Sequence, residues 1–171
     1  QSTQNKNKNP IFHLRASCGP FWVNFETSSS STLKDVDNFL RNLWLECCGH
    51  LSAFKINNQT YSSSPDKDFD DKSMNEKLEK VLLPGFSFNH EYDFGTTTEL
   101  SLKCISKKEG TCDKEVVILA KNNPILFECG NCQKTAVSVC SQCIFEDKYL
   151  FCEMCSKEHD CGEDMLLPVV N

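Results

Sequence analysis

The strongest constraint on this chain is a run of metal-binding side chains between Cys129 and Cys161. Seven cysteines and one histidine fall within these 33 residues. They form four pairs: Cys129 with Cys132, Cys140 with Cys143, Cys152 with Cys155, and His159 with Cys161. A Cys-x-x-Cys turn places two sulfurs on one ion, and four thiolate or imidazole donors complete a closed tetrahedral zinc site. The sequence therefore predicts eight ligands for two structural zinc ions, with iron–sulfur ligation as a weaker alternative.

Two pairings of these ligand pairs remain open from the sequence. In a cross-braced arrangement the first and third pairs hold one ion and the second and fourth hold the other, whereas in a sequential arrangement neighbouring pairs share an ion. The spacers are short, and the order of pairs is similar to that of cross-braced fingers of the B-box, ZZ, MYND and HIT types. We therefore favour cross-bracing. A segment of about 40 residues seldom folds without metal, disulfides or a partner, so the zinc is expected to replace a hydrophobic core.

Composition limits the compartment and the partners. The chain has 12 cysteines, no secretory signal and no apolar run of about 18 residues, which predicts reduced thiols, a cytoplasmic location and no membrane partner. Because it does not begin with Met, we expect it to be part of a longer natural chain.

Charge argues for a protein partner over nucleic acid. The formal net charge is −6, and residues 125–171 hold three Lys against eight Asp and Glu. Non-specific nucleic-acid binding normally needs a basic stripe, and the linear sequence shows none. The nucleic-acid alternative requires a basic face built by folding from Lys103, Lys107, Lys108 and Lys121.

Hydrophobic periodicity predicts an α+β fold with a mostly antiparallel sheet, one long helix and one short helix. Leu33, Val36, Leu40 and Trp44 recur at helical spacing after Thr32, which with Asp35 forms a potential capping box. Alternating or apolar runs predict strands at 11–17, 21–27, 51–56, 86–94, 99–106 and 115–121, with a short helix from Ser73 to Leu82. We expect a flexible tail at 1–10, an α+β domain at 11–123 and a zinc module at 124–171.

An enzymatic alternative rests on Cys47, Cys48, His50, His90 and Asp93, which could form a metal- or thiol-dependent site. If "HEYDFG" is a strand, however, alternation places His90 and Asp93 on opposite faces. No complete catalytic set and no phosphate-binding glycine motif is present, so no catalytic residue is assigned. Trp22 and Trp44 are interpreted as core anchors.

Residues 11–120 resemble a known family. "FHLRASCGPFWVNFE", "TLKDVDNFLRNLWLECCGHLSAFKINNQTY" and "HEYDFGTTTELSLK", in that order, are similar to the plasmid pRiA4b-type family, also labelled as transposon-passenger TnpR-like. The resemblance implies a compact α+β domain found in bacteria and archaea, largely without an assigned activity, here with an attached metal module. The resolvase-like label implies a serine nucleophile supported by several arginines, whereas this chain has only Arg15 and Arg41. The resulting prediction is a zinc-binding, non-enzymatic protein that binds an unidentified protein partner.

Overall fold

A computed structural model describes residues 9–45, 49–110, 112 and 115–169 of the chain. These residues divide into two compact units, 1–122 and 123–171. The division lies between Asn122 and Asn123, whereas the sequence places it one residue later. The predicted α+β class with a mostly antiparallel sheet is confirmed.

The described part of the first unit is organised around an eight-stranded sheet with the strand order β5-β4-β3-β6-β7-β1-β2-β8. Every neighbouring pair is antiparallel except β4 with β5. The strands are β1 (Ile11–Cys18), β2 (Phe21–Ser28), β3 (Ser52–Ile56), β4 (Gln59–Ser62), β5 (Lys72–Ser73), β6 (Ser87–Tyr92), β7 (Thr98–Lys108) and β8 (Val116–Lys121). A short 3₁₀ turn, Lys67–Phe69, lies between β4 and β5.

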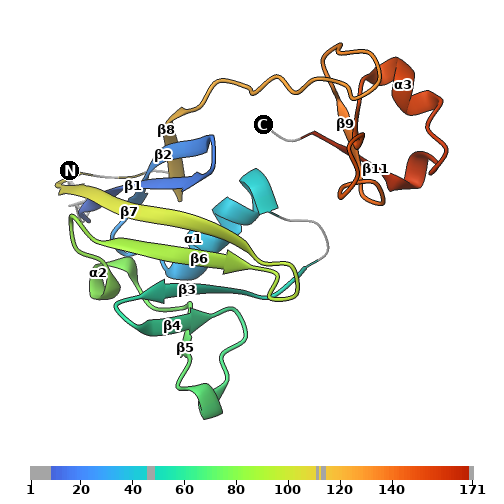
Figure 1. Ribbon diagram of the computed structural model, residues 1–171. Coiled ribbons are helices and arrows are strands. Elements are labelled where there is room, and N and C mark those ends of the chain that lie inside the picture. Colours follow the sequence, from blue (N-terminus) through green and yellow to red (C-terminus); the bar gives the residue numbers. More distant parts are fainter. Residues whose placement is uncertain (1–8, 46–48, 111, 113–114, 170–171) are drawn as a thin grey trace, which may run out of the picture. The chain divides into compact units, whose positions relative to one another are not determined.

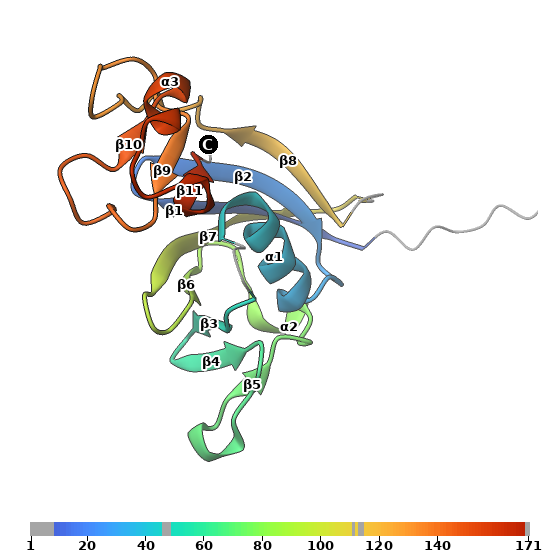
Figure 2. The same cartoon turned by 90° about the vertical axis from the view of Figure 1, so that its right-hand side faces the viewer.

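One face of this sheet carries the core, and helix α1 (Leu33–Leu40) lies against it (Figures 1 and 2). Along β1, Phe12, Leu14 and Ala16 are buried in this core, while Arg15 between them is exposed. Alternation along a strand sends successive side chains to opposite faces. The opposite face of the sheet is therefore lined mainly by polar side chains.

The N-terminus of α1 confirms the predicted capping box. The Thr32 hydroxyl accepts a hydrogen bond from the Asp35 N–H at 3.2 Å, and the Asp35 carboxylate accepts one from the Thr32 N–H at 2.7 Å. Leu33, Val36 and Leu40 enter the core. The helix then continues as a π-helical turn, Arg41–Leu45, which brings the partly buried Trp44 against the core as predicted.

The second helix is shorter than predicted. Helix α2 covers Leu78–Val81, and its N-cap residue is Lys77, not Ser73. Ser73 pairs with Ser62 of β4 as part of β5, and the next residue, Met74, is buried in the core. Tertiary pairing therefore overrides the local capping signal at Ser73.

The second unit is small and has only a small buried cluster among its described residues. A three-stranded sheet has the order β10-β9-β11, accompanied by helix α3. The elements are β9 (Ser138–Cys140), β10 (Leu150–Phe151), α3 (Glu153–Lys157), a 3₁₀ turn (Glu163–Met165) and β11 (Leu166–Pro168). Among the described residues its buried cluster consists of Cys140, Cys143 and Phe151, so two of the three are predicted metal ligands. Hydrophobic burial alone is a weak source of stability in this unit.

Candidate metal centres

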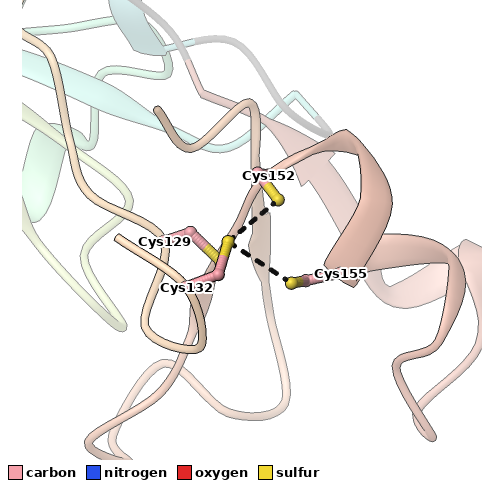
Figure 3. Close-up of side chains that lie close together, drawn as sticks. All are labelled: Cys129, Cys132, Cys152 and Cys155. Atoms are coloured by element: carbon pink, nitrogen blue, oxygen red, sulfur yellow. Dashed lines mark hydrogen bonds between the residues drawn. The ribbon is translucent and has the colours of Figure 1, made fainter. Parts of the chain in front are cut away.

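The first ligand set brings together Cys129, Cys132, Cys152 and Cys155. Their sulfur atoms all lie within 4.8 Å of one another. Figure 3 shows the four side chains converging on one point, with Cys132 Sγ 3.5 Å from Cys152 Sγ and 3.7 Å from Cys155 Sγ. Four sulfurs at about 2.3 Å from a tetrahedral zinc ion would lie about 3.8 Å apart. The spacing therefore fits a single four-coordinate metal ion.

Local backbone structure positions these donors. The Cys129 carbonyl accepts a hydrogen bond from the Gln133 N–H at 3.0 Å, closing the turn that carries Cys132. The Gly130 N–H donates to the Leu150 carbonyl at 2.9 Å, which joins this turn to β10, immediately before Cys152. A side chain at Gly130 would meet the Lys148 backbone Cα at 3.2 Å. The turn therefore favours glycine at this close approach.

The second ligand set consists of Cys140, Cys143, His159 and Cys161, whose donor atoms also lie within 4.8 Å of one another. Cys143 Sγ is 3.6 Å from both His159 Nε2 and Cys161 Sγ. The His159 ring packs on Phe151, with the ring centroids 4.2 Å apart. This apolar contact orients the imidazole and shields one side of the cluster.

The two sets establish the cross-braced pairing that the sequence left open. The first ligand pair meets the third, and the second meets the fourth. The chain must therefore pass from one cluster to the other and back before either set is complete. Each of the two clusters could hold a metal ion, and all eight residues predicted as ligands belong to one of them.

Backbone hydrogen bonds favour the thiolate form of Cys129 and Cys152 in the first cluster and of Cys140 in the second. Burial acts to raise the pKa of Cys129, but hydrogen bonds, that from the Cys152 backbone foremost, lower it to about 6. Burial is likewise outweighed at Cys140, where hydrogen bonding led by the Cys143 backbone lowers the pKa to about 6. The neighbouring thiols raise the pKa of Cys155 to about 12. A cation at the centre stabilises the cysteine ligands as thiolates, so metal uptake is expected to release protons.

The clusters differ in exposure, which leads to a testable difference in metal release. Each cluster has two buried donors, but the first also includes the exposed Cys132, whereas the other two donors of the second are only half-buried. We expect a competing chromogenic chelator to withdraw metal from the first cluster about tenfold faster, on the scale of outer-shell effects on metal sites. Release should be biphasic, with one equivalent in each phase.

Matched serine variants assign the two phases. Cys132→Ser should remove the fast phase and Cys143→Ser the slow one, each leaving the other equivalent in place. Simultaneous release of both ions from the unsubstituted chain would contradict the assigned difference between the clusters.

In the first unit, Asp37 carries a buried polar network that the sequence did not indicate as a site. Its Oδ1 accepts hydrogen bonds from His90 Nε2 and from Ser52 Oγ, both at 2.8 Å. Its Oδ2 accepts from Arg41 Nε and from Lys34 Nζ, both at 2.9 Å. Burial acts to raise the pKa of Asp37, but these bonds, with that from His90 foremost, lower it far below its usual 3.8. The buried carboxylate is therefore ionised and compensated.

The sequence contains a signal for this network. Leu33, Val36, Asp37 and Leu40 occupy successive positions of one helical face, and all four are buried in α1. An acidic residue within an apolar stripe needs hydrogen-bond partners in the core. Those partners come from other elements, so helical periodicity could locate Asp37 but could not name them.

His90 belongs to this network and not to an open catalytic site. Its side chain is fully buried, and its ring packs edge-on against Phe54 at 4.7 Å. His90 Nδ1 has no hydrogen-bond partner among the described residues. A general base must reach a substrate proton. His90 instead links β6 to α1 through its hydrogen bond to Asp37.

His50 and Asp93 lie near each other, whereas His90 bonds to Asp37. His50 Nδ1 is 3.7 Å from Asp93 Oδ1, and the His50 ring stands edge-on to Tyr92 with centroids 5.8 Å apart. Cys47 and Cys48, the thiols of the enzymatic alternative, lie outside the described residues. Of the three described members of that set, the structure brings His50 and Asp93 together.

The cysteine of β7 is a core residue. Cys104 is fully buried, and burial raises its pKa to about 11. A thiol in this environment is a weak nucleophile. Cys18 is half-buried and packs against the same core.

No helix in the described residues is long and apolar enough to cross a membrane.

Comparison with known proteins found similarity to a solved structure but to no family model. No protein-family model matches the chain, and no curated protein does. A solved structure, that of the protein of unknown function MM3350 from Methanosarcina mazei Go1, is similar with a TM-score of 0.55 and 15% sequence identity. The similarity covers 67% of this chain and 70% of that one. About two thirds of the chain therefore shares a fold with a protein of unknown function.

Proposed function

We propose that this chain is a zinc-binding, non-enzymatic protein whose second unit is a two-zinc module that binds another protein. The observation that carries the proposal is the use of all eight donors in two closed sets of four. A catalytic zinc site keeps a position open for water or substrate, whereas a structural site is closed. Sets of four cysteines and of three cysteines with one histidine match the donor preferences of zinc.

An exposed aromatic side chain supports the interaction role. Phe145 is 95% exposed and Ile144 is 46% exposed, directly after the ligand Cys143. The Glu146 N–H donates to the Cys143 carbonyl at 2.8 Å, so this turn is attached to the second metal cluster. Apolar side chains presented on a rigid turn make effective binding anchors because little entropy is lost on association.

The charge of the module indicates the chemistry of the partner. Residues 123–171 contain three Lys against eight Asp and Glu, including Glu146 and Asp147 beside Phe145. Electrostatic complementarity favours a partner with an apolar pocket rimmed by Lys and Arg. The proposed partner is therefore a protein with a basic surface.

Metal content and thiol reactivity test the first half of the proposal. Elemental analysis should find two zinc ions per chain, and chelation should expose the seven cysteine thiols of the two clusters. A third metal ion, or one zinc with labile coordination, would favour an open site and the enzymatic alternative.

Affinity capture with matched variants tests the second half. Phe145→Ser should abolish recovery of the partner without changing zinc content, and the purified partner should rebind the unsubstituted chain but not this variant. Phe69→Ser is the control, because Phe69 is 78% exposed but lies in the first unit. Equal recovery by the two variants, or turnover of a substrate by the first unit, would refute the proposed role.

Two further assignments belong to this proposal. The order of sequence motifs supports placing the first unit in the plasmid pRiA4b-type family. Free thiols in two ligand clusters support a reducing, cytoplasmic environment, because oxidation to disulfides would remove the zinc ligands.

A further inference from the structure

The face of the eight-stranded sheet opposite α1 carries charged and aromatic side chains that are not part of the hydrophobic core. Arg15 of β1 lies directly opposite Lys103 of β7 and also opposite Asn24 of β2. On the same face, Ser17 lies opposite Trp22. Directly opposed residues on neighbouring strands have Cβ atoms about 5 Å apart. Arg15, Lys103 and Trp22 therefore form one surface, named here the Arg15 surface.

Trp22 is part of this surface, which corrects its interpretation as a core anchor. The Arg15 guanidinium lies over the Trp22 ring, 4.8 Å from its centroid. Trp22 is only half-buried, and Arg15 and Lys103 are exposed. An arginine stacked on an aromatic ring presents a flat, cationic platform to solvent.

The positive charge of the Arg15 surface is not neutralised. Elsewhere on this face, Lys55 pairs with Glu91 and Lys108 pairs with Glu26, each at 2.6 Å. Within residues 9–45, 49–110, 112 and 115–169, no ion pair is formed by Arg15 or Lys103. Like charges placed directly opposite each other destabilise a sheet. A bound anion would remove that repulsion.

The Arg15 surface differs from the basic face of four lysines that the nucleic-acid alternative required. Lys107 lies on the other side of the sheet, with its Nζ 5.5 Å from the centroid of the Phe12 ring. Lys108 is neutralised by Glu26. Lys121 lies opposite Val23, whose side chain is in the core. Lys103 of the predicted set lies on the Arg15 surface, joined by Arg15 and Trp22, which lie far from it in sequence.

We propose that the Arg15 surface binds single-stranded nucleic acid. Arg15 and Lys103 each contact a phosphate, and a base stacks against the platform formed by Arg15 and Trp22. Unpaired bases offer the flat face that stacking requires, whereas a duplex hides its bases between neighbours. Asn24 and Ser101 border the cations on the same face and supply uncharged hydrogen-bonding groups. This inference concerns the first unit and goes beyond the protein-binding role proposed for the second.

Fluorescence anisotropy of labelled oligonucleotides tests the proposal. The zinc-loaded full chain is titrated into oligothymidylate and oligouridylate of about 12 nucleotides, within the site sizes of single-strand binders. Two phosphate contacts predict a slope of about −1.4 for log K against log salt, hence about sevenfold weaker binding between about 50 and 200 mM salt. Arg15→Gln and Lys103→Gln should each reduce the slope to about −0.7. Trp22→Leu, or an abasic oligonucleotide, should weaken binding at least about fivefold.

Lys107→Gln is the matched control, because it removes the same charge from the same strand, β7, on the other face. It should leave affinity and salt slope within about twofold of the unsubstituted chain, since only distant screened charge is lost. An effect of Lys107→Gln equal to that of Lys103→Gln would overturn the proposal. The absence of oligonucleotide binding at low salt would do so as well, and equally tight binding of polyglutamate would identify an acidic peptide as the ligand instead.

Discussion

Chelation of the metal-loaded chain at neutral pH is expected to unfold the second unit while the first remains folded. Among the described residues of the second unit, most of the buried apolar and thiol side chains are metal-binding cysteines (Cys129, Cys140, Cys143 and Cys152), so loss of metal removes its organising contacts. Binding of structural zinc contributes about 10–16 kcal/mol in small zinc domains, which exceeds what so few buried side chains can provide. After chelation, the amide resonances of residues 123–169 should collapse to random-coil positions.

The two tryptophans separate the responses of the two units. Trp22 and Trp44 are the only tryptophans of the chain, and both belong to the first unit. Their fluorescence should therefore remain unchanged while seven thiols become reactive, and re-addition of zinc should restore the resonances. Thiols that stay protected after chelation would show that the second unit does not depend on metal.

Replacement of Asp37 by Asn is expected to have the largest effect within the first unit. The substitution removes a fully buried carboxylate that binds His90, Ser52, Arg41 and Lys34. Breaking a buried ion pair by removing one partner costs about 3–5 kcal/mol, because the other charge loses its compensation. We expect the free energy of unfolding, measured by urea titration of tryptophan fluorescence, to fall by that amount.

Glu76→Gln provides the matched control for this change of carboxylate to amide. Glu76 forms an exposed ion pair with Lys80 at 3.4 Å, and such pairs contribute less than about 1 kcal/mol. Zinc content should be unchanged in both variants, because neither residue belongs to a metal cluster. Equal stability of the two variants would show that the Asp37 network contributes no more than a surface pair.

The same network predicts a dependence of stability on pH. The folded state lowers the pKa of Asp37 below its usual 3.8, so the unfolded state binds more protons when pH falls into that range. The stabilisation is therefore fully present above about pH 5 and decreases as pH falls through about 4 towards the folded pKa. Asp37→Asn should lack this component, so the stability difference between variant and unsubstituted chain should narrow below about pH 4. A constant difference from pH 7 to pH 3 would refute this linkage.

Local spacing allowed several features to be predicted from the sequence. The eight ligand residues were identifiable because Cys-x-x-Cys turns place two donors together whatever the rest of the chain does. The capping box of Thr32 and Asp35, the helical face of Leu33, Val36 and Leu40, and the strand alternation are likewise local. The α+β class followed from the helical and strand periodicities of the apolar residues.

Other features depended on contacts between distant segments. Only the tertiary structure showed that the first ligand pair meets the third, that His90 reaches Asp37 across 53 positions, and that Ser73 joins a strand. Strand register likewise placed Arg15 and Trp22 beside Lys103 on the face away from the core.

The difference between the features predicted from the sequence and those that needed the tertiary structure has a physical cause. The sequence by itself determined which residues could bind metal, form strands or begin a helix, because these properties depend on neighbours within about four positions. The tertiary structure decided which distant groups share an ion, a buried carboxylate or a sheet face, because strand order and register set those distances and local spacing does not.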